Sequence, residues 1–588
     1  MKRSHPFVLL SALLGAGIAF ELAHIIYLQV ATFHPLPYLD EWRTMILFSR
    51  AEQEPSAWSL LLVPHAEHRP LLPRLVFLLD TKLAQGTGAF SLAIIDALLL
   101  GLAAVWAFLL TGNGNRNDGT QLAAPYPLAL CIAVLLFSGH QMSNFVRAFQ
   151  VAMLMVCFFA MLSFAAFASA FLPKASVRSA RSLLFISLSC FFGVCAAFSM
   201  GNGLIVLPIL FVIACVRRRE FPPGTILIIG IVAAAALAAY LAAPGSVLGV
   251  LGRTDYKLAP GRAVDLVDFF LAFLGGPWAS VAPGSTTIIG LVTLLSSLYA
   301  IVKYRRLDRL GSYDLVSVGL IALTLISAAA TALARLRFGI EAATESRYST
   351  SVLMLYAALV VSFWPRVHAD AESAEAYKPD AVQTGALVLF ALISFVYGIT
   401  SHRKLPYDYS QWRDVKENAE VAYVADVQDP VAFKDVAPQP QLDLAWQARG
   451  YVLRHKLSVF STTEANFIGR PLTDIFTASD ECIGHLDQVD RTVAGVDGGF
   501  RVTGWAWDTG NPSVPRAALL VEDGIVKGIG RFTAVRPDVV AAIPEVRSVK
   551  NGFVGYVPRG VAKVTAYVLD RDESSVCRIP GDLAPPSG

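Results

Sequence analysis

The stretch AFQVAMLMVCFFAMLSFAAFASAFL, residues 148–172, contains one side-chain amide, Gln150, and no charged residue. It is long enough to cross the ~30 Å apolar core of a bilayer as one helix, which takes ~20 residues. A soluble protein rarely carries so long a run without a charge. This stretch therefore predicts a helical membrane protein.

Working outward from it, the chain divides into two regions of different polarity. Of its 588 residues, 55% are hydrophobic and 16% are charged, against ~25% charged in an average soluble protein. Residues 1–400 hold 27 basic and 21 acidic side chains, a density of 12%, whereas residues 401–588 hold 21 and 24, a density of 24%. We expect a membrane region followed by a soluble region. The net charge of +3 excludes a strongly basic nucleic-acid binder.

Apolar runs bounded by charged or turn residues recur along residues 1–400, and eleven of them are candidate membrane spans. Three are short for a bilayer, which leaves their tilt and boundaries open. A further apolar stretch at 264–274 predicts an interfacial or re-entrant helix. The eleven candidates are 6–31, 88–111, 123–139, 148–172, 183–199, 203–216, 224–243, 285–302, 314–334, 348–364 and 383–400.

Basic residues concentrate in alternate connections, all on one side of an eleven-span chain. The positive-inside rule makes that side the cytoplasm, so the amino terminus lies inside and residues 401–588 lie outside. A cleaved signal peptide over residues 1–31 is the alternative, but its apolar part is longer than a usual signal core. The basic groups are Lys2 and Arg3; Arg116; Lys174, Arg178 and Arg181; Arg217, Arg218 and Arg219; Lys303, Arg305, Arg306 and Arg309; and Arg366.

The polar region has its own internal division. Residues 401–485 mix helix-like and irregular stretches and form a connecting region. Residues 486–588 alternate polar and apolar positions between turn signals, which predicts a small β-sandwich. Cys482 and Cys577 are the only cysteines of the polar region, and they predict one disulfide that closes an exported domain.

An acidic pair lies just after the first candidate span. Asp40 and Glu41 follow Pro35 and Pro37 and precede Trp42. Adjacent carboxylates at a membrane face can act as a general base or hold a divalent cation such as Mg²⁺ or Mn²⁺. The alternative is structural, with Asp40 as an amino-terminal helix cap and Trp42 as an interface anchor.

A second polar motif, HAEHR, lies in the same first outer connection, residues 32–87. His65, Glu67, His68 and Arg69 are typical of a contact with an anionic substrate. Flanking prolines predict a turn, and the pattern differs from the H-E-x-x-H motif of zinc peptidases, so it predicts no specific metal site. A solvated polar loop is the alternative.

Further polar residues gather at the ends of later spans, on the same predicted outer face. Guanidinium groups match a phosphate bidentately and stay charged at any physiological pH. Each arginine could instead snorkel to the interface, but the positive-inside rule predicts few arginines on this side, which favours an anionic ligand. The residues are Asn144, Arg147, Arg335, Arg337, Glu345, Arg347 and Tyr348.

Taken together, these motifs resemble the GT-C-fold membrane glycosyltransferases, in particular a poorly characterised bacterial branch. Members of that branch share D-E-W, H-x-E-H-R, N-F-x-x-x-F-Q and S-R-Y elements. The likeness covers roughly residues 1–420 and leaves the terminal β-domain unaccounted for. In this chain the four elements are residues 40–42, 65–69, 144–150 and 346–348.

The resemblance implies transfer of a sugar from a polyprenyl-phosphate carrier to a cell-envelope glycan or lipid, at the outer face of the bacterial inner membrane. It gives the role of base or metal ligand to Asp40, with Glu41 second. Phosphate binding goes to Arg347 first, then to Arg69 or Arg147. The reaction it implies is an inverting displacement, in which fixed cations meet the charge that develops on the leaving phosphate. No D-x-D triplet stands at residues 40–42, which leaves metal dependence open.

Two other functions stay open at this point. A transporter or flippase for lipid-linked sugars would explain the polar outer face. Such proteins usually place ionisable groups near mid-membrane and show internal repeats, whereas this sequence has few mid-span charges, Glu21 and Asp96, and shows no repeat. A non-catalytic assembly protein would use the terminal β-domain to bind glycan.

Overall fold

The structure, a computed structural model of the chain, contains two compact units. The first is made of Met1–Val30, Ser56–Val76 and Ser91–Asp408, and the second of Ala31–Pro55, Phe77–Phe90 and Tyr409–Gly588. The first outer connection is therefore divided between the units. The structure describes residues 5–53, 57–111, 120–122, 125–170, 180–219, 221, 223–245, 262–306, 311–364, 366–368, 381–403, 409, 411–492 and 498–586.

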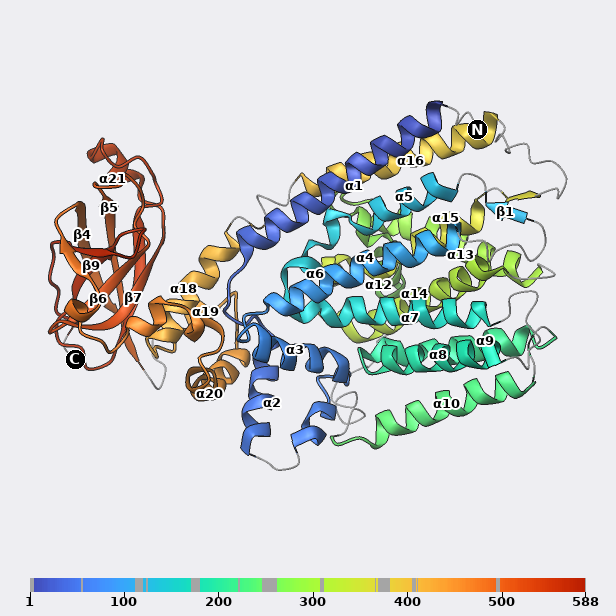
Figure 1. The fold of residues 1–588 in the computed structure, drawn as a ribbon, viewed down its shortest axis with the longest axis horizontal. Helices are drawn as coiled ribbons and strands as arrows, with labels where there is room; N and C mark the ends of the chain where they lie inside the picture. Colours follow the sequence, from blue (N-terminus) through green and yellow to red (C-terminus); the bar gives the residue numbers. More distant parts are fainter. Residues whose placement is uncertain are drawn as a thin grey trace. The chain divides into compact units, whose positions relative to one another are not determined.

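The first unit is largely helical (Figure 1). Every one of the eleven predicted spans coincides with helix, and α12 (Arg262–Gly275) covers the predicted interfacial stretch. Helix α7 packs against both α8 and α14, and α12 packs against α13. The span helices are α1 (His5–Thr32), α4 (Ala89–Thr111), α5 (Pro125–Leu136), α7 (Val151–Ser169), α8 (Ala180–Ala197), α9 (Val206–Val216), α10 (Pro223–Ala242), α13 (Thr286–Arg306), α14 (Ser312–Arg335), α15 (Ser349–Phe363) and α16 (Ala381–His402).

Eight helical segments of the described chain are long and apolar enough to cross a membrane. The segments that correspond to the three other predicted spans are shorter: Gly201–Val216, α15 with 15 residues, and the Val388–His402 part of α16. Eleven crossings therefore stay a prediction. The eight are Val8–Thr32, Ala89–Thr111, Pro125–Val146, Ala148–Ser169, Ala180–Ala197, Pro223–Ala242, Thr286–Arg306 and Ser312–Phe338.

Short helices interrupt the apolar stretch between α5 and α7 and carry its polar residues. The 3₁₀ turn η3 (Gly139–Gln141) begins after Ser138, whose hydroxyl accepts a hydrogen bond from the His140 amide. Helix α6 (Met142–Val146) then ends at Arg147, whose backbone is extended before the turn η4 (Ala148–Gln150). The N-F-x-x-x-F-Q element thus lies where the helical path is broken, which turns its side chains toward neighbouring segments.

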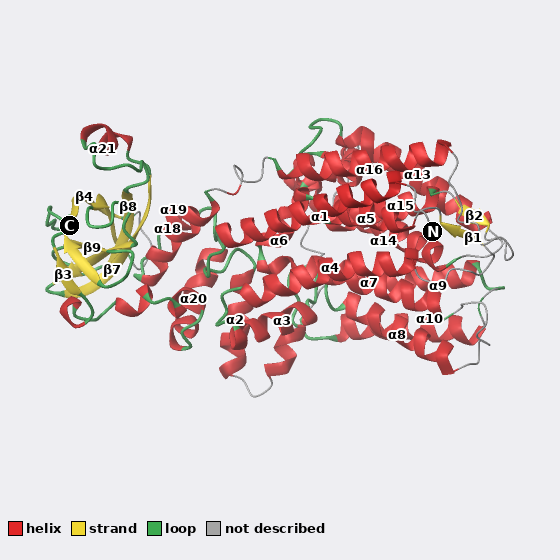
Figure 2. Ribbon diagram, turned by 45° about the horizontal axis from the view of Figure 1, so that its top comes forward, coloured by secondary structure: helices red, strands yellow, loops and turns green. Residues whose placement is uncertain are grey.

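The second unit contains an eight-stranded sheet in the order β3-β10-β9-β6-β7-β8-β5-β4. Figure 2 shows several of its strands in yellow. All neighbouring pairs are antiparallel except β3 and β10, which are parallel. The β-structure was predicted correctly, but it forms a single curled sheet and not a sandwich of two sheets. The strands are β3 (Thr477–Ser479), β4 (Cys482–Arg491), β5 (Gly499–Asp508), β6 (Ala517–Glu522), β7 (Ile525–Ala534), β8 (Gly552–Pro558), β9 (Thr565–Leu569) and β10 (Ser575–Arg578).

The curl brings the two ends of this sheet together. Strand β4 forms one edge, and its Cys482 forms a disulfide with Cys577 of β10, beside the opposite edge, with Cα atoms 6.0 Å apart. Glycines permit the close backbone approach that the bend requires, since a Cβ atom at Gly528 would lie 1.8 Å from the Tyr556 carbonyl oxygen. The alternation of polar and apolar residues predicts where the strands lie, but it does not predict which strands pair or which ones form the edges of the sheet.

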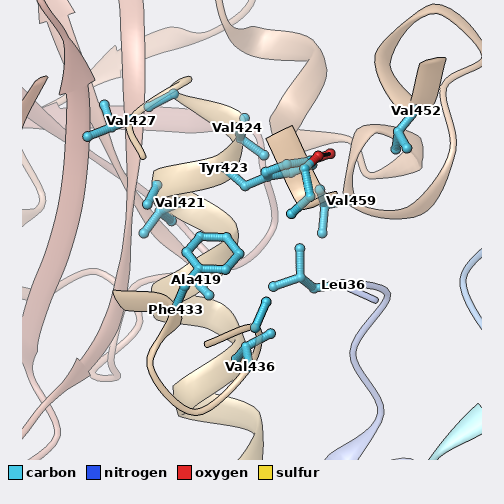
Figure 3. Packing of buried hydrophobic residues seen from close by; sticks show 14 of the residues in the cluster. Leu36, Ala419, Val421, Tyr423, Val424, Val427, Phe433, Val436, Val452 and Val459 are labelled. Atoms are coloured by element: carbon cyan, nitrogen blue, oxygen red, sulfur yellow. Dashed lines mark hydrogen bonds between the residues drawn. The ribbon is translucent and has the colours of Figure 1, made fainter. Parts of the chain in front are cut away.

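Helices of the connecting region pack on this sheet and on the segment after α1. Helices α2 (Glu41–Gln53), α18 (Trp412–Val424), α19 (Pro430–Phe433) and α20 (Gln441–Arg454) surround a hydrophobic core (Figure 3). Trp42 and Tyr423 are both fully buried in this core, with ring centroids 5.1 Å apart. Trp42 is therefore a core residue of the second unit and not an interface anchor.

Candidate functional site

The HAEHR motif of the first unit begins with a tight turn, as its flanking prolines predicted. The His65 amide donates to the His68 carbonyl at 2.7 Å, and the His68 amide donates back to the His65 carbonyl at 2.9 Å. Ala66 accommodates the turn with a φ of 50°. This geometry holds the two histidines and Glu67 at the tip of a short hairpin.

Glu67 forms the centre of a polar cluster at this hairpin. One of its carboxylate oxygens, Oε1, lies 2.8 Å from the Arg335 guanidinium and 3.4 Å from His68 Nε2. The other ring nitrogen of His68, Nδ1, accepts a hydrogen bond from the Gly201 amide at 3.2 Å. A Cβ atom at Gly201 would lie 2.6 Å from that nitrogen, so this position of the SMGNG stretch requires glycine.

The charge state of Glu67 follows from these contacts. Burial alone would raise the pKa of its carboxyl group, but the nearby His68 and Arg335 outweigh burial, and the pKa lies below its ordinary value. Glu67 is therefore a carboxylate at neutral pH. The three side chains are each about one quarter exposed or less, at 25% for Glu67, 18% for His68 and 26% for Arg335.

The N-F-x-x-x-F-Q and S-R-Y elements, about 200 residues apart in sequence, meet in the first unit. The Asn144 amide donates to Thr350 Oγ1 at 3.0 Å and to the Arg347 carbonyl at 3.3 Å. The Ser143 backbone amide donates to the Ser346 hydroxyl at 3.1 Å. Asn144 is fully buried, so its contribution is to fix the backbone that carries Arg347. Because its side chain is buried, Asn144 has no access to a substrate itself.

The same elements connect to the HAEHR hairpin. The rings of His65 and Phe149 lie 5.1 Å apart between centroids. The S-R-Y element joins them through the hydrogen bonds from Ser143 and Asn144. Three of the predicted motifs therefore form one cluster in the first unit.

Arg347 is the arginine of this cluster best placed to contact a ligand. Its guanidinium lies 2.8 Å from the Glu345 carboxylate and 5.1 Å from the centre of the Tyr348 ring. The side chains of Arg347 and Glu345 are 35% and 43% exposed, so the pair is reachable from solvent. A carboxylate partner and an aromatic face orient the guanidinium without burying it.

Arg69 has a different role from the predicted phosphate contact. Its side chain is fully buried, and its two terminal nitrogens donate four hydrogen bonds to the carbonyl oxygens of Leu62, Ala243, Pro244 and Gly245. Both terminal NH₂ groups are thereby used. Arg69 is a clamp between two loops, and it cannot also bind a phosphate bidentately.

A neighbouring arginine that the sequence did not single out supports this clamp. The Arg74 guanidinium donates to the carbonyl oxygens of Leu61 and Val63 at 2.7 and 2.5 Å. Burial, together with the charge of Arg69, lowers the pKa of Arg74 to about 10. The sequence did hold a sign of this structural role, because Arg74 lies among apolar residues in α3 (Leu71–Leu83).

The remaining predicted arginines lie outside the cluster core. Arg337 is exposed, with its guanidinium 4.7 Å from the centre of the Phe338 ring. Arg147 is partly buried at the junction of α6 and η4. Among the described residues, Arg337 forms no ion pair with Glu67, whose arginine partner is Arg335, and Arg347 pairs with Glu345.

Asp40 and Glu41 belong to the second unit. Glu41 begins α2, and its carboxylate accepts a hydrogen bond from the Tyr38 amide at 2.9 Å, so it helps to start that helix. Asp40 is partly exposed immediately before the helix, and Leu39 precedes it with a φ of 47°.

A metal at Asp40 and Glu41 would require further donors. Among the residues that the structure describes, no three His, Cys, Asp or Glu side chains gather in a group that could hold a metal ion. The carboxylate of Glu41 is already used in the start of α2. Dependence on a divalent cation therefore stays a prediction.

The second unit also contains a buried charge network that the sequence did not reveal. Glu420 accepts hydrogen bonds from Arg531 at 3.1 and 3.3 Å and lies 3.0 Å from His34 Nε2, and Glu464 lies 3.0 Å from Arg531. Arg516 adds a contact to Glu464 at 3.0 Å. The network lines a polar cavity of about 690 Å³. His34 and Glu420 are 386 positions apart in the sequence, so no local motif marks the network.

No protein-family model matches the sequence, and no curated protein matches it. Among solved structures, the chain is similar to the archaeal oligosaccharyltransferase AglB from Archaeoglobus fulgidus, solved in complex with an inhibitory peptide and a dolichol-phosphate. The TM-score is 0.36 and the identity 15%, over 72% of this chain and 60% of that one. This chain thus spans less than two thirds of that protein's length.

Proposed function

We propose that the chain is a membrane glycosyltransferase. Its donor is a sugar carried on a polyprenyl phosphate, its acceptor is a hydroxyl group of a cell-envelope glycan or lipid, and it acts at the outer face of the bacterial inner membrane. The observation that carries the proposal is the meeting of the H-x-E-H-R, N-F-x-x-x-F-Q and S-R-Y elements in one cluster of the first unit. The cluster leaves Arg347 oriented and partly exposed, as a site for a phosphate requires.

In this reaction the acceptor hydroxyl attacks the anomeric carbon and the bond from that carbon to the phosphate oxygen breaks. The bonding electron pair leaves with the phosphate, and the hydroxyl proton passes to a carboxylate. The family resemblance gives the role of base to Asp40, which belongs to the second unit, so this assignment rests on the resemblance and not on the cluster of the first unit. Arg347 stabilises the charge that develops on the phosphate, with Arg335 as the second guanidinium of the cluster.

The phosphate contact is tested with a matched pair of variants on the same loop. Arg347→Lys keeps the positive charge but loses the bidentate geometry, and we expect its kcat/KM for a radiolabelled polyprenyl-phosphate sugar to fall by about tenfold or more, the equivalent of one charge-assisted hydrogen bond of ~1.5–3 kcal/mol. Arg337→Lys is the control and retains full activity. Equal loss in the two variants would remove Arg347 from the phosphate site.

The base is tested separately. Asp40→Asn abolishes transfer while the protein accumulates and melts as the wild type does. The control is Glu52→Gln in α2, because Glu52 is an exposed carboxylate that pairs with His455 and Arg454. Full activity of the Asp40→Asn variant would end the role of Asp40. Movement of a labelled lipid across liposomes without sugar transfer would instead identify a transporter.

A further inference from the structure

A second concave surface lies in the first unit, away from the motif cluster. Three helices, α9, α13 and α14, enclose a groove of about 1040 Å³. From α9 it is lined by Pro208, Val212 and Val216, and from α14 by Val318, Ala322 and Ile326. Both sets are spaced four residues apart, so each forms one stripe along its helix. The groove is apolar along most of its length.

One end of this groove is strongly basic. The carboxyl end of α9 contributes Arg217, Arg218 and Arg219, and the carboxyl end of α13, almost 90 residues later, contributes Arg305 and Arg306. None of the described residues that line the groove is acidic. Apart from Arg217, whose guanidinium contacts the Tyr304 carbonyl at 3.4 Å, these arginines are exposed. Two separate chain segments therefore place cations at the same end of one apolar surface.

The groove has the length of one leaflet. Eleven helical steps separate Ile205 from Val216 at the arginine end, which at ~1.5 Å per residue amounts to ~16 Å. The apolar core of a bilayer is ~30 Å thick, so the groove covers about half of it. Its floor includes the small side chain of Ala322 on α14, with Val318 and Ile326 one turn to each side.

We propose that this groove binds one phospholipid with an anionic headgroup, from the leaflet at the arginine end. The acyl chain lies along the apolar stripes of α9 and α14, and the headgroup phosphate contacts Arg218, Arg305 and Arg306. Simple snorkelling explains arginines at helix ends, but it does not explain a concave apolar surface that leads into them. The charge bias of the sequence makes this the cytoplasmic leaflet. The proposal does not depend on the proposed glycosyl transfer.

The test uses the full-length protein purified in detergent, with dioleoyl-phosphatidylglycerol or dioleoyl-phosphatidylcholine added and retained lipid counted by native mass spectrometry. We expect one phosphatidylglycerol retained per chain and at least tenfold less phosphatidylcholine. Ala322→Phe, which fills the floor of the groove, lowers phosphatidylglycerol retention at least fivefold. The control is Ile288→Phe, because Ile288 is 68% exposed on α13 but lies outside the groove, and it leaves retention unchanged.

A second variant keeps the test valid if the filled groove impairs folding. The double substitution Arg305→Lys with Arg306→Lys keeps the basic charge that sets topology, yet it removes bidentate contact to a phosphate. It also lowers retention several-fold. Equal retention of the two lipids, or retention unchanged in both groove variants, overturns the proposal. Displacement of phosphatidylglycerol by equimolar polyprenyl phosphate would overturn the assignment to a phospholipid.

Discussion

Replacing Glu420 by glutamine breaks the buried charge network of the second unit at its centre. The Glu420 side chain is 5% exposed and holds Arg531 through both oxygens and His34 through one. Glutamine keeps the shape of the side chain but has one acceptor oxygen and no charge. Arg531, 13% exposed, would then keep only Glu464 as a charged partner. Loss of one of the two carboxylates that pair with a buried guanidinium destabilises the folded state.

The structure gives the size of the effect. Burial by itself would raise the pKa of Glu420, but Arg531 and His34 together outweigh it and hold the pKa at about 2, against an ordinary value of 4.5. That difference corresponds to about 3 kcal/mol of stabilisation from the ionised form. It agrees with the ~3–5 kcal/mol that follows removal of one partner of a buried pair. We therefore expect Glu420→Gln to lower the free energy of unfolding by about 3 kcal/mol.

The assay is denaturant unfolding of the full chain in detergent micelles, followed by tryptophan fluorescence, because Trp42 is buried in the same unit. The control is Glu417→Gln on the same helix, α18. Glu417 pairs with Arg413, whose side chain is 55% exposed, so the change costs at most ~1 kcal/mol. If the two variants unfolded within about 0.5 kcal/mol of each other, the network would contribute no more than a surface pair, and the reasoning would be refuted.

The same network predicts how stability depends on pH. Because the folded pKa of Glu420 lies below its unfolded value, its contribution is fully present above about pH 4.5 and is lost as the pH falls toward 2. The wild type therefore loses stability steeply across that acidic range. Glu420→Gln has no such group to protonate, so its acid transition is shallower over the same range.

Two further predictions concern the clamp and the disulfide. Arg69→Lys replaces the four hydrogen bonds of the guanidinium with those of a single ammonium group. We expect the free energy of unfolding in detergent to fall by about 2–4 kcal/mol, with an unchanged KM for the donor lipid. A variant that is as stable as the wild type but binds the lipid more weakly would contradict the clamp. The double variant Cys482→Ser with Cys577→Ser removes a disulfide that joins residues 95 positions apart. We expect it to destabilise the second unit by ~2–5 kcal/mol in the same assay, and reduction of the wild type should do the same. No change in either experiment would show that the sheet keeps its curl without the disulfide.

Sequence patterns predicted most of the helices and strands, because each depends on residues close together in the chain. The eleven apolar runs all proved helical, and the alternation after residue 486 marked strands correctly. The strand order did not follow from alternation, since the pairing of β6 with β9 and of β5 with β8 depends on residues far apart. Tertiary contacts of this kind have no local signal.

In the candidate site, too, local motifs were predictable from the sequence and tertiary contacts were not. The order of short motifs was enough to predict a cluster that includes Glu67, Arg347 and Tyr348. Both Arg347 and Arg69 were predicted on the outer face of the membrane region. The sequence did not show that Arg347 is partly exposed while Arg69 is fully buried among carbonyl oxygens. In the sequence Arg69 stands beside a proline and Arg347 lies two residues after a glutamate. Only the burial of the side chain in the folded protein shows which arginine is accessible to a ligand and which is a structural clamp. Glu420 and Arg531 were missed because neither belongs to a motif.

The make-up of the second unit has a consequence for how the protein is synthesised. Helix α2, with Trp42, Met45 and Ile46, completes a core whose other walls come from residues after 409. At ~5–20 residues per second, the ribosome needs roughly 20–70 s to make the ~350 residues between them. For that time Trp42 lacks Tyr423, against which its ring packs in the finished core. The core of the second unit therefore closes only when the last third of the chain has been translated.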